Sequence, residues 1–571
     1  MTAELPQDPA TRLAPLASAP DASPIRAGRS APSSELDQPQ DQAIDRRWFL
    51  SRMAAVWAAA GAGTLLGGGL AAAPAAARGG GSGVWETAYA KTIRRAALDD
   101  PTELTISEAA AAFRRRLLRP TDLMEAYLDR LATFGDVYKA FLWRPTDAQL
   151  LAAARRVRID SRSTPLAGIV TAEKDNFYTK DIPTTAMSPV YADFVPGYDS
   201  TVHARMKAAG AIMMGKAAMG PLASGRARLP DGTATTVNAW TPDDIRYSPS
   251  GSSGGTATAV AGRLSTSGTG TQTGGSITSP SQAQNLTGLK PTFGRASLFG
   301  IVPLTFTRDH PGPLARDAMD AAIMLQSFAG PDRNDPRTLG MPPVPNLVKA
   351  ATVYTYRGKP KVRWSTTVGY PPDFLSGANA ETRPLRQSLL DTLVAVGCRV
   401  AEVPYPAEWE PLSALSSTAG EATNMFLPFL REDVSLFADR LPGFLNGMFR
   451  SSDSYMKMLQ ARYQFLRLVL DQVFDKCDVF LTGTVFDGIG LPLIAFPYGM
   501  GVDTATGLPV PRGTTLGAPP FGEERLLAVV AAYQAVTEHH LRRPPDPSPV
   551  AARSFTAPYK VPPDYDASDE T

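Results

Sequence analysis

The sequence predicts a globular protein of the α/β class, and two observations lead to this prediction. Short apolar runs of strand character alternate with amphipathic helical segments along the centre of the chain, which is typical of a sheet flanked by helices. Hydrophobic residues make up 43% and charged residues 20% of the chain, as in a soluble globular protein. A length of 571 residues allows one very large domain or two to four ordinary ones.

The first predicted elements are helices over residues 103–135. Ser107 is the expected N-cap of the first helix, because it follows Thr105 and Ile106 and precedes an alanine-rich run. The second is expected to begin at Pro120, with an apolar face at helical spacing.

Two strands with a helix between them are predicted next. Residues 168–172 and 211–214 are short apolar runs, and residues 203–209 form the intervening helix. Gly210 is expected to end that helix.

The remaining predicted elements lie on either side of a tract rich in small residues. Residues 248–279 are almost entirely Gly, Ser, Thr and Ala, a composition that disfavours helix. Residues 408–465 are mostly helical in pattern, with breaks expected near Pro428 and Pro442. Their clustered phenylalanines suit either an ordinary core or the lining of a substrate entrance. A strand over 478–481 and a helix over 523–540 follow.

The N-terminal segment predicts export. Residues 1–44 lack aromatic side chains and are too polar to fold. Residues 45–77 contain Arg46-Arg47, an Ala/Gly/Leu run and small residues suited to cleavage near Ala77, the pattern of a twin-arginine signal peptide. A retained membrane helix is the alternative. We expect a flexible mature N-terminus over residues 78–99 and an extended tail over residues 546–571.

Charge and cysteine content exclude several classes. A formal net charge of +2 gives no footprint for nucleic acid. Cys398 and Cys477 are too few for a disulfide framework and suit two buried thiols or one bridge. Because no Cys/His/Asp/Glu cluster has metal-ligand spacing, we expect neither a metal nor a cofactor.

Three polar residues form a candidate catalytic set. They are Lys174, Ser252 in a Ser-Gly-Ser-Ser-Gly-Gly run, and Ser276 in Gly-Gly-Ser. Burial lowers the pKa of a lysine and makes the neutral amine a base. Such a lysine can activate one serine through another, without histidine.

The surrounding motifs resemble the amidase signature family, the serine hydrolases with a Ser–cis-Ser–Lys triad. The resemblance covers roughly residues 100–545, and many separate motifs occur in the family's order. They are residues 168–176, 199–202, 208–211, 215–216, 248–255, 270–277, 288–295, 312–316, 507–510 and 520–523.

The resemblance implies a single large domain over residues 100–545 with a central mixed β-sheet. It places Lys174 beneath Ser252, makes Ser276 the nucleophile, and implies a cis peptide bond before Ser252. It also implies an oxyanion hole of backbone amides, in which adjacent glycines permit close approach; the amides are those of Thr273, Gly274, Gly275 and Ser276.

Three positions depart from the family pattern. Gln272 stands where a carboxylate is usual, and Thr278 stands where arginine is common; the two changes fit a coupled exchange. Glu173 precedes the lysine where a small apolar residue is common. On a strand its side chain is expected to point away from Lys174.

We therefore predict an exported amidase that hydrolyses a carboxylic amide through an acyl-serine intermediate. Residues 301–309 resemble the branch that includes peptide amidases, which favours a peptide or an aryl or acyl amide as substrate. The expected partners are that substrate and the twin-arginine translocation machinery, with no nucleic acid. Homodimerisation and the acyl and amine specificity stay open.

The sequence also permits four other interpretations. The chain could be a glutamine-hydrolysing amidotransferase subunit with tRNA partners, or a catalytically silent binding protein, which Gln272 and Thr278 would suit. Ser253 is central in a G-x-S-x-G pattern, the α/β-hydrolase elbow, but its flanks lack an apolar strand. Residues 210–217 approach a P-loop but lack its Ser or Thr.

Overall fold

The structure is a computed structural model that describes residues 82–414, 419–483 and 485–548. The predicted N-terminal extension (1–44) and export signal (45–77) lie outside these ranges. In the part of the chain that is described, no helix has both the length and the apolarity needed to cross a membrane.

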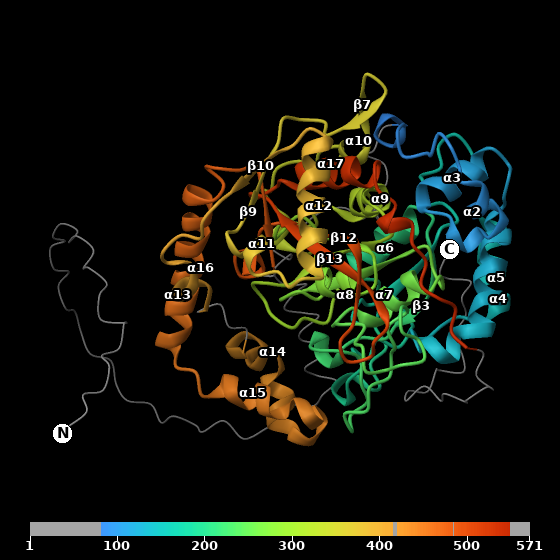
Figure 1. Ribbon diagram of the computed structural model, residues 1–571. Coiled ribbons are helices and arrows are strands. Elements are labelled where there is room, and N and C mark those ends of the chain that lie inside the picture. Colours follow the sequence, from blue (N-terminus) through green and yellow to red (C-terminus); the bar gives the residue numbers. More distant parts are fainter. Residues whose placement is uncertain (1–81, 415–418, 484, 549–571) are drawn as a thin grey trace, which may run out of the picture. The chain divides into compact units, whose positions relative to one another are not determined.

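The central element is an eleven-stranded sheet (Figure 1). It is mixed, because β2 pairs in parallel with β3 and β4, whereas β4 pairs antiparallel with β6. This confirms the predicted α/β fold with a central mixed β-sheet flanked by helices. In spatial order the strands are β1 (Phe141–Trp143), β3 (Ile212–Ala217), β2 (Val170–Lys174), β4 (Ser267–Gln272), β6 (His310–Ala315), β5 (Thr287–Lys290), β12 (Leu493–Val502), β13 (Pro509–Gly517), β11 (Val479–Thr482), β9 (Thr367–Tyr370) and β10 (Arg399–Glu402).

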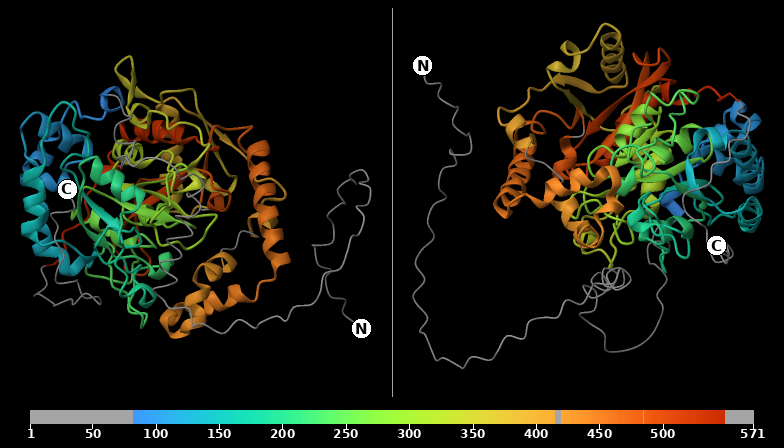
Figure 2. Two further views of the ribbon diagram at one scale, coloured as in Figure 1. Left: turned by 180° about the vertical axis from the view of Figure 1, so that it is seen from behind. Right: turned by 90° about the horizontal axis from the view of Figure 1, so that it is seen from below.

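Helices cover the sheet, and a separate hairpin joins β7 (Tyr354–Tyr356) to β8 (Lys359–Lys361). The views from the front, behind and below show the helices around the strands (Figures 1 and 2). The helices are α2 (Arg95–Asp99), α3 (Ile106–Arg114), α4 (Pro120–Tyr138), α5 (Asp147–Arg156), α6 (Thr201–Ala208), α7 (Gly254–Ala261), α8 (Thr278–Ala283), α9 (Ala318–Phe328), α10 (Leu347–Ala351), α11 (Asp373–Ser376), α12 (Thr382–Ala395), α13 (Trp409–Ala414), α14 (Ala419–Glu432), α15 (Leu441–Met448), α16 (Ser452–Gln472) and α17 (Glu523–Gln534).

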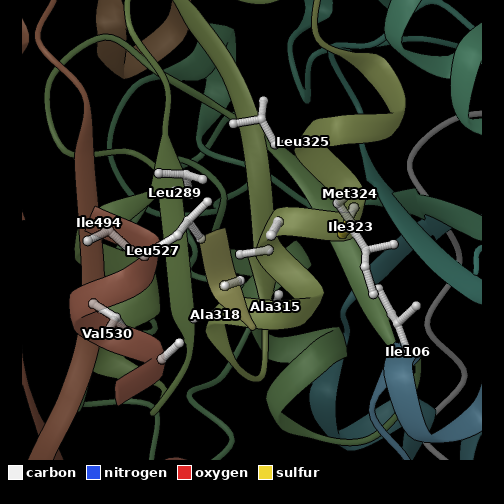
Figure 3. Close-up of a cluster of buried hydrophobic side chains, with 14 of the residues drawn as sticks. Ile106, Leu289, Ala315, Ala318, Ile323, Met324, Leu325, Ile494, Leu527 and Val530 are labelled. Atoms are coloured by element: carbon white, nitrogen blue, oxygen red, sulfur yellow. The ribbon is translucent and has the colours of Figure 1, made fainter. Parts of the chain in front are cut away.

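The main core lies where α9 and α17 pack on the sheet (Figure 3). Leu527 and Val530 of α17 lie near Ile494 of β12 and Leu289 of β5, and all four are fully buried. Each such side chain contributes roughly 1.5–3 kcal/mol when it leaves water. This packing fixes the strands that carry the polar residues described below.

The first predicted helix begins earlier than expected. Its N-cap is Thr105, whose Oγ1 accepts a hydrogen bond from Glu108 N at 3.2 Å, while Glu108 Oε2 accepts one from Thr105 N at 3.2 Å. The prediction of Ser107 as N-cap was wrong because this reciprocal capping box satisfies two free amides at once. The second helix, α4, begins at Pro120 as predicted.

The strand–helix–strand segment forms with shifted boundaries. Strand β2 runs on to Lys174 and β3 to Ala217, beyond the predicted ends, because both strands are buried along their whole length. Gly210 follows α6 with φ +89°, the left-handed conformation expected of a helix-ending glycine.

The tract of small residues is partly helical, contrary to the prediction. Helix α7 lies within the tract, and α8 begins at its end and continues beyond it. Every residue of α7 is buried. Small residues are needed there because a Cβ on Gly255 would lie 2.2 Å from the carbonyl oxygen of Ala218. Close packing therefore overrides helix propensity.

Residues 408–465 are mainly helical, but Pro428 lies inside α14 and does not break it. Pro442 lies in the first turn of α15, where a proline needs no amide. Phe426, Phe437 and Phe444 are buried and meet with ring planes at steep angles. These rings form the core of a helical subassembly, which supports the core interpretation of the cluster.

Both ends of the described chain differ from the predictions. In the segment 82–99, expected to be flexible, Ala88 and Ala97 are fully buried in the main core. The final helix ends at Gln534 and not near His540. In the expected tail, Asp546 forms an ion pair with Arg130 at 2.6 Å. Contacts made far along the chain thus hold Ala88, Ala97 and Asp546.

We predict that Leu527→Ala lowers the free energy of unfolding by about 2–5 kcal/mol, because it leaves a cavity between α17 and the sheet. Val536→Ala is the control: Val536 is 46% exposed, so its change should stay within about 0.5 kcal/mol. Denaturant unfolding of both variants measures the difference. Equal losses would contradict this account of the core.

Candidate active site

The candidate residues come from three segments that meet at one edge of the sheet. Lys174 is the last residue of β2, Ser252 immediately precedes the turn into α7, and Ser276 follows β4. Because β2 and β4 are parallel neighbours, their carboxyl ends lie at the same edge. The structure thereby brings together residues that are far apart in the sequence.

Lys174 is fully buried, and its Nζ lies 2.7 Å from Ser252 Oγ. It also lies 2.8 Å from Thr271 Oγ1 and 3.2 Å from the carbonyl oxygen of Thr271. Within the described residues no carboxylate forms an ion pair with this amine. Desolvation lowers the pKa of Lys174 to about 7, and the charge of Asp309 only partly opposes this. A large share of the amine is therefore neutral near pH 7.

Ser252 is fully buried, and the Gly251–Ser252 peptide bond is cis. Ser276 is 8% exposed, and its carbonyl oxygen accepts a hydrogen bond from Ser253 N at 3.3 Å. The hydroxyl oxygens of Ser252 and Ser276 are not hydrogen-bonded to each other in the described part of the chain. The serine segments are thus joined through the backbone.

Gln272 organises the turn that carries Ser276. Its Oε1 accepts hydrogen bonds from Ile277 N at 2.7 Å and from Thr278 N at 2.8 Å, and Thr278 Oγ1 lies 3.2 Å away. Gln272 and Thr278, two of the three residues that depart from the family pattern, therefore lie in contact. A neutral amide here keeps the acceptor that the turn needs.

The backbone amide of Gly275 is directed away from the predicted oxyanion position. With φ +90°, Gly275 donates its N–H to Asp487 Oδ2 at 2.8 Å. The expectation that all four amides line an oxyanion hole is therefore corrected: Gly275 N is engaged by a buried carboxylate. Gly274, by contrast, is exposed at the pocket with open space beside it.

A cavity of about 400 Å³ opens onto Ser276. Thr273, Gly274, Gly251, Arg226 and Leu304 are among its lining residues. The volume falls in the range of small-molecule sites. Polar groups dominate the walls near the serine, and an amide substrate could reach its hydroxyl there.

Glu173 points to the opposite face of β2 from Lys174, as strand alternation predicts. Its Oε2 lies 2.9 Å from His203 Nδ1, and both side chains are buried. The carboxylate is therefore not a partner of the Lys174 amine.

The two motif lookalikes have structural roles. Ser253 is fully buried and donates from Oγ to the carbonyl oxygen of Thr271 at 3.4 Å, so it is no exposed elbow. Lys216, the lysine of the P-loop near miss, lies in β3 and donates to the carbonyl oxygen of Phe177 at 2.6 Å. That lysine is part of the interior.

Several polar residues of the site were not predicted from the sequence. Asn176 Nδ2 donates to Thr271 Oγ1 at 3.0 Å and orients a group that touches Lys174. Asp309 accepts from Thr273 Oγ1 at 2.5 Å. Three of these residues lie within motifs quoted in the sequence analysis: Asn176, Thr271 and Asp309. Their membership of motifs that carry the resemblance could have identified them as part of the site. Asp487 lies outside every quoted motif and had no such signal.

Comparisons with known proteins agree with the resemblance. Protein-family profiles match residues 122–487 to the family described as Amidase. The A-type subunit of glutamyl-tRNA(Gln) amidotransferase from Syntrophobacter fumaroxidans is 31% identical over 499 residues, covering 78% of this chain and 99% of that protein. Its counterpart from Roseiflexus sp. is 32% identical over 501 residues, covering 77% and 98%.

Solved structures show the same fold. The peptide amidase of Stenotrophomonas maltophilia is similar with a TM-score of 0.65 and 26% identity, over 79% of this chain and 99% of that one. The A-type subunit of the Thermotoga maritima glutamyl-tRNA(Gln) amidotransferase has a TM-score of 0.58 at 23% identity, over 76% and 94%, which shows the fold alone. The family match and the relatives above 30% identity together establish that this chain belongs to the amidase signature family, whose members act on carboxylic amide C–N bonds.

Proposed function

We propose that the chain hydrolyses a carboxylic amide through an acyl intermediate on Ser276. The observation that carries this proposal is the buried Lys174 amine 2.7 Å from Ser252 Oγ, without an ion-pair partner among the described residues. A neutral amine in this position can accept a proton. The pocket that opens onto Ser276 gives an amide carbonyl access to the hydroxyl.

The proton moves in two transfers. Lys174 takes a proton from Ser252 as Ser252 takes one from Ser276, whose Oγ forms a bond to the amide carbon. The two hydroxyls must approach each other for this step, and such contacts often shorten only when substrate is bound. The proton then returns to the departing amine as the C–N bond breaks, and water releases the acid.

The developing oxyanion needs preorganised donors. Backbone amides of Thr273, Gly274 and Ser276 remain as the donors in this proposal, since Gly275 N is engaged by Asp487. Removal of one such donor in other enzymes costs roughly 10²–10³ in rate.

A peptide or an aryl or acyl amide is the proposed substrate, and export through residues 45–77 is the proposed location. The similarity to the peptide amidase of Stenotrophomonas maltophilia supports the substrate class. The signal pattern in the sequence supports export. A homodimer is proposed as the assembly.

A second candidate is a glutamine-hydrolysing subunit of an amidotransferase. The curated relatives named above are glutamyl-tRNA(Gln) amidotransferase subunits of the A type that match nearly end to end, and they favour this candidate more than an exported peptide amidase. It requires further subunits and tRNA as partners. A silent binding protein is the third candidate, motivated by Gln272 and Thr278.

The nucleophile is tested with a fluorophosphonate and peptide mapping by mass spectrometry. We expect an adduct on Ser276 that is absent in Ser276→Ala and retained in the matched control Ser253→Ala. Hydrolysis of amides should disappear in the first variant and persist in the second. An adduct on Ser253 would contradict the assignment, and a folded protein without any adduct would favour the silent binding protein.

The charge state of Lys174 is tested through stability. Its folded pKa of about 7 lies below the ordinary lysine pKa of 10.5, so between these values the unfolded chain binds more protons. The free energy of unfolding should therefore rise with pH, by at most about 1.4 kcal/mol per pH unit. Lys174→Met should rise less steeply, because it lacks this contribution and keeps that of the buried Lys290, whose pKa is lowered to about 8. The free energies of unfolding of wild type and Lys174→Met are compared from about pH 7.5 to about pH 9.5, between the two pKa values. If the two curves run parallel, folded Lys174 stays charged, which would contradict the proposal.

Release of ammonia separates the two enzyme candidates. A stand-alone amidase should hydrolyse a peptide amide as the purified chain. An amidotransferase subunit should hydrolyse glutamine, with a rate that rises when its partner subunits and charged tRNA are added. Peptide-amide turnover without glutamine turnover selects the first candidate, and the reverse selects the second.

A further inference from the structure

Asp487 joins the turn of Ser276 to a buried cation. Its Oδ2 accepts from Gly275 N at 2.8 Å, and its Oδ1 accepts from Gln272 Nε2 at 2.7 Å. Lys290 Nζ lies 3.7 Å from the same Oδ1, and all three side chains are fully buried. Asp487 belongs to a short 3₁₀ helix (Val485–Ile489), 215 residues along the chain from Gln272.

The two hydrogen bonds need two acceptors on one side chain. A carboxylate supplies an acceptor at each oxygen, whereas an asparagine amide has one acceptor and one donor group. With asparagine, either Gly275 N–H or Gln272 Nε2 would face a donor. Lys290 would also lose the carboxylate that compensates its buried charge.

Charge balance explains why glutamine faces this carboxylate. Burial raises the pKa of Asp487, while Lys290 opposes the shift. If residue 272 were also a carboxylate, it would lie at hydrogen-bonding distance from the carboxylate of Asp487. The two groups would then either share one proton or repel each other. Residues 272 and 487 are thus one unit with a single negative charge.

We infer that Asp487 is a positioning residue for the nucleophile. Asp487 acts through its contacts with Gly275 and Gln272. By accepting the hydrogen bond from the Gly275 amide, it turns this amide toward the interior. The next residue, Ser276, is then presented to the cavity. Gln272 transmits the same constraint to the amides of Ile277 and Thr278. This inference rests on the proposed acyl-serine mechanism.

The unit can be exchanged without changing its shape. In the double variant Gln272→Glu with Asp487→Asn, the new asparagine can donate from its Nδ2 to the new carboxylate while its Oδ1 accepts from Gly275 N. The carboxylate at position 272 still accepts from Ile277 N and Thr278 N. Each hydrogen bond has a donor and an acceptor again, and the negative charge is kept.

The test measures fluorophosphonate labelling of Ser276 and amide turnover in four proteins: wild type, Gln272→Glu, Asp487→Asn and the double variant. We expect Asp487→Asn to slow labelling about 100-fold, as a misplacement of roughly 1 Å does, with kcat reduced and KM nearly unchanged. The double variant should recover to within about tenfold of wild type, which is the coupling expected of contacting residues.

Asp332→Asn is the matched control. Asp332 is a buried carboxylate that accepts from Thr201 Oγ1 at 2.5 Å and Ser297 Oγ at 2.6 Å, away from the Ser276 turn. Its replacement should lower thermal stability without slowing labelling. If Asp487→Asn does not fold, the comparison of Gln272→Glu with the double variant still tests the inference, because adding Asp487→Asn should restore labelling that Gln272→Glu has lost.

The outcomes separate the inference from the proposed mechanism. A wild type that is never labelled at Ser276 would overturn the mechanism. A labelled wild type whose Asp487→Asn variant reacts at full rate would overturn the inference alone. A double variant slower than both single variants would likewise show that residues 272 and 487 do not act as a unit.

Discussion

The buried amine of Lys174 is the constraint on which the candidate site depends. Removing a lysine from water without an ion-pair partner disfavours its charged form, so the fold must provide hydrogen-bonding groups that tolerate a neutral amine. Ser252 Oγ and the two oxygens of Thr271 provide them. Because β2 and β4 are adjacent and parallel, one sheet edge holds the amine, the threonine and the start of the nucleophile turn. The core between α17 and the sheet packs on β12 and β5, farther along the same sheet.

The turn of Ser276 is held by two side chains from distant segments and by one from the end of β4, immediately before the turn. Asp487, Asp309 and Gln272 each contact it through a buried hydrogen bond. Buried polar groups need such partners, since an unpaired one costs free energy. This arrangement explains how a glutamine can stand where the family usually has a carboxylate: the negative charge lies on Asp487, next to it. It also shows why the number of oxyanion donors has to be taken from the structure and not from the motif.

Hydrophobic periodicity predicted the α/β class and the ordered motifs predicted the family, because both are local signals. The mixed sheet was implied by the resemblance to that family. The sequence also placed Glu173 on the opposite face from Lys174, which follows from strand geometry alone. The helix at residues 254–261 escaped prediction because burial against Ala218 outweighs a poor propensity. The role of Asp487 escaped it for another reason: a contact with Gln272 across 215 residues leaves no periodic trace. Both Thr105 and Ser107 are residue types that can cap a helix. Thr105 caps α3 because it forms a reciprocal pair of hydrogen bonds with Glu108.

The most direct test of the central claim is the rate of Ser276 labelling by a fluorophosphonate as a function of pH. If neutral Lys174 activates the serine through Ser252, the second-order rate constant falls with a single protonation near pH 7, about tenfold for each further pH unit, because only the neutral amine accepts a proton. The Ser252→Ala variant then reacts slowly at every pH. A wild-type rate that stays constant from about pH 5.5 to about pH 8.5, on both sides of that protonation, or a Ser252→Ala variant as fast as wild type, would contradict the account.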